Sequence, residues 1–112
     1  ELINPYCFAT PTAPHIAADL ENISIEMDQI QTAFDHLSKK TDYIVVEGIG
    51  GWHVPFSETC TSIDCAQQLA LPVILIVGIQ LGCLNHTMLT VAAIQQSTPI
   101  LSTPKAHIMK KT

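Results

Sequence analysis

The chain has 112 residues, of which 47% are hydrophobic and 13% charged, and its formal net charge is -5. That length suits one globular domain with a modest core, and the acidic balance argues against a basic surface for nucleic acid or anionic membranes. No apolar run approaches the ~20 residues that span a bilayer and the first residues do not resemble a signal peptide, so we expect a cytoplasmic protein without nucleic acid or membrane as a partner.

The first third of the chain predicts a loop followed by a helix. Three prolines between residues 4 and 15 block helix continuation and predict an extended loop. Ser24 is then a candidate helix cap, and Lys39 and Lys40 stand at the end that favours cations. The apolar positions that recur at helical spacing between them are Met27, Ile30, Phe34 and Leu37.

The next segment predicts a buried strand that delivers a carboxylate into a glycine-rich turn. Residues 43–46 are continuously apolar, which suits a strand covered on both faces, as in a parallel sheet. Glu47 follows at the carboxyl end, where open α/β sheets bind ligands, and its oxygen suits Mg²⁺ beside phosphates. Gly48, Gly50 and Gly51 permit positive φ and close approach of a ligand. The alternative is a capped strand end with a flexible turn.

The remaining elements continue the alternation of helices and strands. Thr61 or Ser62 can cap a short helix, and residues 73–77 form a second continuous apolar strand. Residues 85–96 return to a helical pattern, with these apolar positions: Met88, Leu89, Ala92 and Ala93.

This order predicts βαβ units and therefore an α/β fold, with a parallel sheet flanked by helices. Periodicity fades after residue 97, and we expect the basic end, residues 105–111, to be an exposed tail.

The four cysteines are scattered without a Cys-x-x-Cys pair, so we expect reduced thiols. Zinc bound by Cys60, Cys65 and His53 is an alternative, but their spacing matches no usual zinc ligand pattern.

Four motifs occur in a characteristic order: NPY with PTAPH at 4–6 and 11–15, VEGIGGW at 46–52, PVILIVG at 72–78, and LGCLNH at 81–86. Together, over residues 4–96, they resemble the dethiobiotin synthetase family. The resemblance implies a P-loop NTPase-like, three-layer α/β/α fold. It also implies an ATP- and Mg²⁺-dependent ligase of biotin biosynthesis, which closes the ureido ring of dethiobiotin from 7,8-diaminopelargonate and CO₂.

The resemblance also assigns roles to individual residues. It implies Glu47 as the Mg²⁺ ligand, and these residues bind ATP: Glu47, Gly48, Ile49 and Gly50. It implies the following substrate-binding residues, the last four reaching the substrate carboxylate across a homodimer interface: Gly51, Gly82, Cys83, Leu84 and Asn85. Unpaired amides at a helix start suit a carboxylate. The alternative reading of Asn85 is a simple helix cap.

Several family elements are absent from the sequence. There is no Gly-x-x-x-x-Gly-Lys-Thr phosphate loop, no following lysine-bearing segment with its Mg²⁺-binding aspartate, and no Asn-Asp base-recognition strand after Gln96. Residues 98–104 faintly resemble the family's late strand and proline loop near the adenine. We therefore expect residues 1–112 to be a single, incomplete α/β domain, and we assign no catalytic residue in it.

Two related functions are kept as alternatives, a cobyrinate-type amidating synthetase and a partitioning-type ATPase of the same superfamily. Among other candidate residues, we expect His15 to be hydrogen-bonded within its loop and Glu58 to be solvated. His86 suits either a buried interface or a supporting position behind the site, and Cys83 is disfavoured as a nucleophile.

Overall fold

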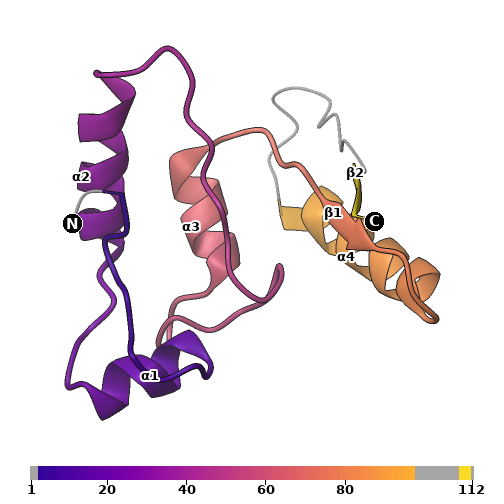
Figure 1. The fold of residues 1–112 in the computed structure, drawn as a ribbon, viewed down its shortest axis with the longest axis horizontal. Coiled ribbons are helices and arrows are strands. Elements are labelled where there is room, and N and C mark those ends of the chain that lie inside the picture. The colour runs from indigo at the N-terminus through magenta and orange to yellow at the C-terminus, as the bar shows by residue number, and fades with distance from the viewer. Residues whose placement is uncertain (1–2, 98–108, 112) are drawn as a thin grey trace. The chain divides into compact units, whose positions relative to one another are not determined.

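The computed structural model describes residues 3–97 and 109–111 (Figure 1). The elements follow in this order: α1 Pro14–Leu20, α2 Met27–Ser38, α3 Ser62–Leu69, β1 Ile76–Gly78, α4 Cys83–Ser97 and β2 Met109–Lys111. The chain divides into two compact units, Glu1–Leu69 and Ala70–Thr112, and each is described by itself. No described helix is long and apolar enough to cross a membrane. The resemblance at residues 98–104 and the lysine at 105 lie outside the described residues.

Helix α1 forms where the sequence predicted the end of a loop. Pro14 is its first residue. The amide at this position has no acceptor within the helix, and the fixed φ of proline is already helical, so proline is favoured there. The helix buries Ala17 and Ala18, which are 1% and 3% exposed. Asn22, with φ 53°, turns the chain out of the helix in the left-handed conformation that asparagine tolerates. Three prolines therefore mark the loop correctly up to Ala13, and the third of them begins a helix.

Helix α2 confirms the predicted helix, but its cap comes from elsewhere in the chain. Glu26, and not Ser24, precedes its first turn, and the Glu26 amide donates a hydrogen bond to the Tyr6 hydroxyl (2.8 Å). The Tyr6 hydroxyl donates in turn to Gln29 Oε1 (3.0 Å), while the Ser24 hydroxyl donates to Glu26 Oε1 (2.6 Å). The loop before α1 is thereby tied to the start of α2.

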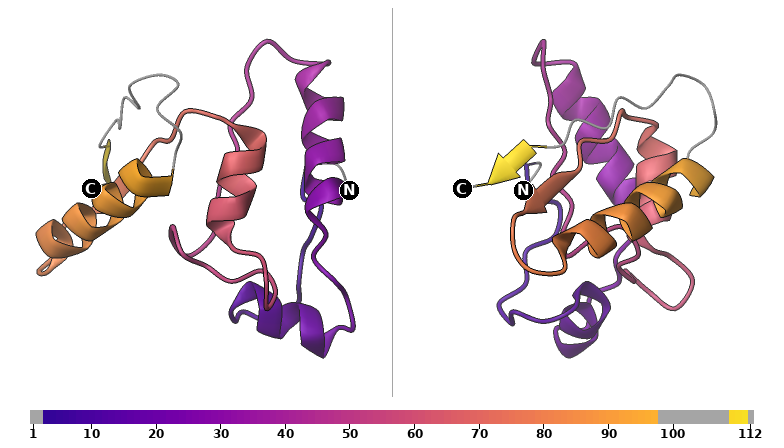
Figure 2. Two further views of the ribbon diagram at one scale, coloured as in Figure 1. Left: turned by 180° about the vertical axis from the view of Figure 1, so that it is seen from behind. Right: turned by 90° about the vertical axis from the view of Figure 1, so that its right-hand side faces the viewer.

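Helix α3 lies beside α2 in the first unit (Figure 2). As predicted, Thr61 stands at its start, and the Asp64 carboxylate accepts hydrogen bonds from the Thr61 amide (2.7 Å) and hydroxyl (2.8 Å). A carboxylate in the first turn also interacts favourably with the helix dipole. At the other end, Ala70 has φ 51°, the left-handed conformation in which helices usually place glycine.

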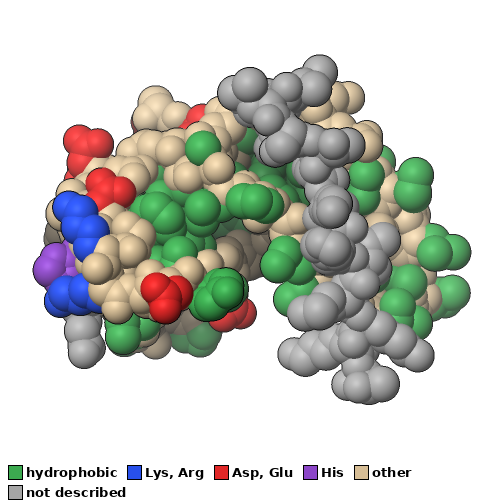
Figure 3. All heavy atoms as spheres, turned by 90° about the horizontal axis from the view of Figure 1, so that it is seen from above, with side chains coloured by type: hydrophobic (Ala, Val, Ile, Leu, Met, Phe, Trp, Pro, Cys, Tyr) green, Lys and Arg blue, Asp and Glu red, His purple; other side chains and the backbone are tan. Residues whose placement is uncertain are grey.

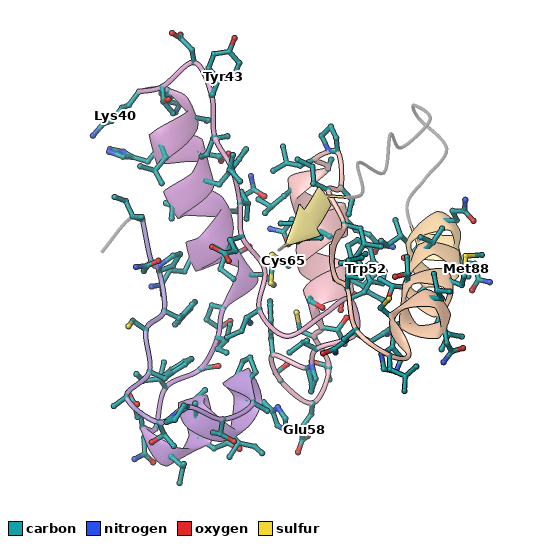
Figure 4. The ribbon with its side chains drawn as sticks, turned by 45° about the vertical axis from the view of Figure 1, so that its right-hand side comes forward. Lys40, Tyr43, Trp52, Glu58, Cys65 and Met88 are labelled. Atoms are coloured by element: carbon teal, nitrogen blue, oxygen red, sulfur yellow. The ribbon has the colours of Figure 1, made fainter. Side chains whose placement is uncertain are left out.

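The expected strand at residues 43–46 is absent. The segment has no hydrogen-bonded partner strand among the described residues, and Tyr43 and Val45 are 90% and 86% exposed. Tyr43 lies just beyond the end of α2 (Figure 4). A strand is defined by its ladder, so an apolar, β-branched run alone is insufficient when nothing pairs with it. The prediction of a strand covered on both faces is therefore wrong for this structure.

In the second unit, β1 pairs in parallel with β2, with Ile76 opposite Met109 and Gly78 opposite Lys111. The predicted strand at 73–77 is thus shorter and displaced toward its carboxyl end. Exposure alternates from residue 71 to 78, so the segment is covered on one face, not on both as expected. The last three residues of the expected basic tail that the structure describes form a strand instead.

Helix α4 packs against β1 and buries Ile94, which is 4% exposed. It begins two residues earlier than the sequence predicted. Two of the apolar positions of the predicted helix, Met88 and Leu89, are 68% and 63% exposed, so the buried face is a different one. Figure 3 shows such hydrophobic side chains at the surface.

We expect Ala70→Gly to raise the free energy of unfolding by about 1 kcal/mol, because a left-handed residue with a Cβ costs roughly 1–2 kcal/mol that glycine avoids. Ala66→Gly, the same change inside α3, is the matched control and should lower it by about 1 kcal/mol. Urea unfolding of both variants measures the difference. A loss of stability in Ala70→Gly equal to that of the control would contradict the role of residue 70 as a helix terminus.

The Thr61 hydroxyl and amide hydrogen bonds hold the pKa of Asp64 below its ordinary value. A carboxyl whose pKa is lowered by folding contributes stability that is present above its ordinary pKa, about 3.9, and is lost as pH falls through the lower, folded value. We therefore expect the stability difference between the native sequence and Asp64→Asn to be constant at neutral pH and to shrink in acid below about pH 4. Unfolding curves over a pH series measure it, and a difference that persists unchanged in acid would refute the assignment.

Candidate functional site

The glycine turn after Glu47 is exposed and well defined. Glu47, Gly48 and Gly50 are exposed, and Ile49 is 58% exposed. The Gly51 amide donates a hydrogen bond to the Ile49 carbonyl (2.9 Å), which closes the turn. The turn therefore presents a carboxylate and a short run of backbone amides to solvent from one stretch of chain.

Two of these glycines differ in what the fold requires of them. Gly50 has φ 78°, and a Cβ at this position would lie 3.1 Å from Val54 Cγ2. A Cβ at Gly48 would meet nothing within 4 Å, and its backbone is not left-handed. The fold thus explains the glycine at 50 but leaves open space at 48, where a ligand can approach the backbone.

Ser62, the first residue of α3, holds the chain that follows the turn. Its hydroxyl accepts a hydrogen bond from the Val54 amide (3.0 Å), and its single proton is shared between the nearer Trp52 carbonyl and the Gly51 carbonyl (3.2 Å). Its amide donates to the Val54 carbonyl (2.8 Å). The sequence suggested Ser62 only as a helix cap, because no local pattern reveals contacts to residues 8 to 11 positions away.

Glu47 is the one carboxylate that the turn offers to a cation. No group of three or more His, Cys, Asp or Glu side chains in the described part of the chain is arranged to hold a metal ion. Mg²⁺ commonly keeps several waters and binds one or two carboxylates together with substrate phosphates, so a single exposed glutamate fits it as a partial ligand set. Glu58 lies exposed in the loop before α3 (Figure 4), as predicted.

The alternative zinc site at Cys60, Cys65 and His53 is not formed among the described residues. Both thiols are partly buried, and Cys65 lies on α3 (Figure 4). Burial raises the pKa of Cys60, with a smaller contribution from the Asp64 charge, and burial likewise raises the pKa of Cys65, with a smaller contribution from Cys60. Protonated thiols are poor nucleophiles and poor metal ligands, which suits structural cysteines.

The second candidate segment begins α4. Gly82, with φ 92°, immediately precedes the helix, and its carbonyl accepts a hydrogen bond from the His86 amide (3.2 Å). The Cys83 amide donates to the Gln80 carbonyl (3.0 Å). Asn85 is therefore the third residue of the helix and not its cap, because Gly82 supplies the bend that starts the helix.

The residues of this helix start differ in exposure. Leu84 is 81% exposed, Asn85 is exposed and Cys83 is half-buried. The amides at the second and third helical positions have no acceptor within an α-helix, so they remain donors for a ligand. Gly51 belongs to the first unit and this helix start to the second.

The two histidine candidates lie in different surroundings. His15 lies in the first turn of α1, and its Nδ1 is buried without a hydrogen-bond partner among the described residues, so the expected loop hydrogen bond is absent at that atom. The cause is its position: a helix-start side chain no longer faces the loop carbonyls that an extended segment would offer. His86 is exposed on α4 in the single chain, and both interpretations given for it stay predictions.

Comparison with known proteins places these features in a family. A family model described as "AAA domain" matches residues 1–107. The chain is 49% identical over 92 residues to an ATP-dependent dethiobiotin synthetase BioD of Aromatoleum aromaticum. The aligned residues make up 82% of this chain and 41% of that protein. The chain is 48% identical over 95 residues to BioD 1 of Escherichia coli O157:H7 (85% and 42%) and 46% identical over 97 residues to BioD of Pseudescherichia vulneris (87% and 40%).

The chain spans about two fifths of the length of these relatives. Their names agree with the resemblance that the four motifs indicate, and they favour it over the amidating synthetase and the partitioning ATPase. The chain belongs to the AAA domain family, within which it is similar to ATP-dependent dethiobiotin synthetases.

Proposed function

We propose that this chain carries part of the ATP and substrate sites of a cytoplasmic, ATP- and Mg²⁺-dependent dethiobiotin synthetase. The observation that carries the proposal is the exposed Glu47 followed by a glycine turn with open space at Gly48, in a chain 49% identical to such a synthetase. In the reaction, one amine of 7,8-diaminopelargonate takes up CO₂ as a carbamate, and ATP phosphorylates the carbamate. The second amine then closes the ureido ring, and ADP and phosphate leave.

The residues of the turn have defined tasks in this proposal. The amides from Gly48 to Gly50 donate hydrogen bonds to phosphate oxygens, and the absence of a side chain at 48 lets the phosphates approach. The Glu47 carboxylate would be one of the ligands of the ion. When bound, Mg²⁺ offsets the negative charge that develops on the transferred phosphoryl group. No covalent nucleophile is needed, which agrees with the protonated thiols of Cys60 and Cys65.

We also propose the three-layer α/β/α arrangement for the whole enzyme. The parallel pairing of β1 with β2 and the packing of α4 on β1 support it in the second unit. In the first unit, the exposed apolar run that contains Tyr43 and Val45 has the composition of a sheet strand and lacks only its neighbours.

The start of α4 is proposed to bind the substrate carboxylate of a neighbouring subunit in a twofold homodimer. Leu81, Leu84 and Met88 are 105%, 81% and 68% exposed, and the last two stand one helical turn apart. Such an apolar stripe beside free helix amides supports an interface that buries the leucines and brings the amides to a ligand.

We expect Glu47→Gln in the protein expressed from its complete gene to lower turnover about tenfold or more at limiting Mg²⁺, because the amide keeps the shape but loses the charge that holds the ion. Excess Mg²⁺ should restore part of the activity. Glu58→Gln, the same change at an exposed glutamate of the neighbouring loop, is the control and should behave like the native enzyme. Steady-state kinetics over a Mg²⁺ titration decides the matter, and identical titrations for both variants would remove Glu47 from the metal site.

A mixed-dimer experiment tests the shared site. One subunit carries Glu47→Gln, and the other carries Asn85→Trp, which the exposed position accommodates without disturbing the unit. If sites are shared, one of the two sites in a heterodimer is free of both changes, so the mixture should recover up to half of the native activity per heterodimer. Both parent homodimers should stay weak. Heterodimers that form without any recovery would place the carboxylate within one subunit.

A further inference from the structure

The Ser62 hydroxyl binds three backbone groups of the glycine turn and of the chain that follows it. A serine hydroxyl offers one donor and two acceptor positions, and here it accepts from the Val54 amide while donating toward the Gly51 and Trp52 carbonyls. The Ser62 amide holds the Val54 carbonyl as well. Both backbone groups of Val54 are therefore bound to one residue of α3.

Val54, whose backbone is bound by Ser62, lies next to the glycine turn. Because a Cβ at Gly50 would lie 3.1 Å from Val54 Cγ2, the Val54 side chain occupies the space in which a side chain at residue 50 would stand. Gly51 is fixed from both sides, since its amide binds the Ile49 carbonyl and its carbonyl accepts from Ser62. The turn is thus bordered at Gly50 by the Val54 side chain and held at Gly51 through a hydrogen bond.

Ser62 lies at a helix start that is itself stabilised by hydrogen bonds. Ser62 begins α3 directly after Thr61, whose amide and hydroxyl are bound by the Asp64 carboxylate at 2.7 and 2.8 Å. A ligand-binding backbone gains affinity when its geometry is fixed before the ligand arrives, because less ordering remains to be done on binding.

We propose that Ser62 is a positioning residue for ATP binding, which acts through Val54 and Gly51 to fix the amides of Gly48 to Gly50. It touches no ligand itself. This inference rests on the proposed function, in which those amides bind phosphate oxygens.

The test compares Ser62→Ala with the native protein, each expressed from its complete gene. We expect the KM for ATP, and the Kd of a non-hydrolysable ATP analogue measured by calorimetry, to rise about five- to tenfold, the effect of roughly one lost hydrogen bond. Because the Ser62 hydroxyl also binds the carbonyl of Gly51, an expected substrate-binding residue, the KM for 7,8-diaminopelargonate should rise as well, but less than the KM for ATP. Ser62→Thr, which keeps the hydroxyl, should restore the native KM for ATP. If Ser62→Ala does not fold, Ser62→Cys, which keeps the shape with a weak hydrogen-bonding group, replaces it.

Ser57→Ala is the matched control. The Ser57 hydroxyl also accepts two backbone hydrogen bonds in the same loop, from the amides of Thr59 (3.3 Å) and Cys60 (3.1 Å), but these do not reach the glycine turn. This variant should lose a comparable amount of thermal stability and keep the native KM for ATP. Native ATP affinity in Ser62→Ala, or an equal loss in Ser57→Ala, would overturn the positioning role. A native protein without Mg-ATP-dependent turnover would instead overturn the proposed function, and the inference with it.

Discussion

The loop between Trp52 and α3 must satisfy its backbone polar groups without a sheet, and the start of α3 provides the partners. The Ser62 hydroxyl and amide bind the loop at its beginning, and the Cys60 carbonyl accepts from the amides of Phe56 and Ser57 nearer its end. A short antiparallel bridge joins Pro55 to Thr61. Because a partly buried, unpaired amide or carbonyl is costly, these bonds determine the path of the loop. The exposed turn beside Glu47 takes its shape from that path.

Local sequence patterns predict the helices well, because helix formation depends largely on interactions between residues close in sequence. The positions of Met27, Ile30, Phe34 and Leu37 were sufficient to locate α2, and comparable patterns located α3 and α4. Helix α1 was missed, although Pro14 at a first helical position before two small residues was an available signal. Ser24 as the cap of α2 and the alternative of Asn85 as the cap of α4 are both wrong, because a tertiary contact with Tyr6 and the positive φ of Gly82 determine how these helices start.

The predicted strands differ from the structure more than the predicted helices do. An apolar run indicates that a segment can be buried. A strand also needs a neighbouring strand that offers hydrogen-bond donors and acceptors in register. Residues 76–78 have that neighbour in β2, and they form a strand. Residues 43–46 have none among the described residues, and Val45 stays 86% exposed. An edge of this kind is a liability for aggregation, so the physical requirement for a covering partner is strong.

The candidate site divides in the same way between what sequence and structure reveal. The sequence could indicate Glu47 and its glycines, since a carboxylate after an apolar run and before flexible backbone is a local feature. It could not distinguish the glycines from one another. Gly50 is required by the fold, through its φ of 78° and because a Cβ there would crowd Val54, whereas nothing in the fold requires a glycine at 48. A residue that the chain does not need for its own packing is the better indicator of a ligand, so Gly48, more than Gly50, marks the place where the phosphates are proposed to bind.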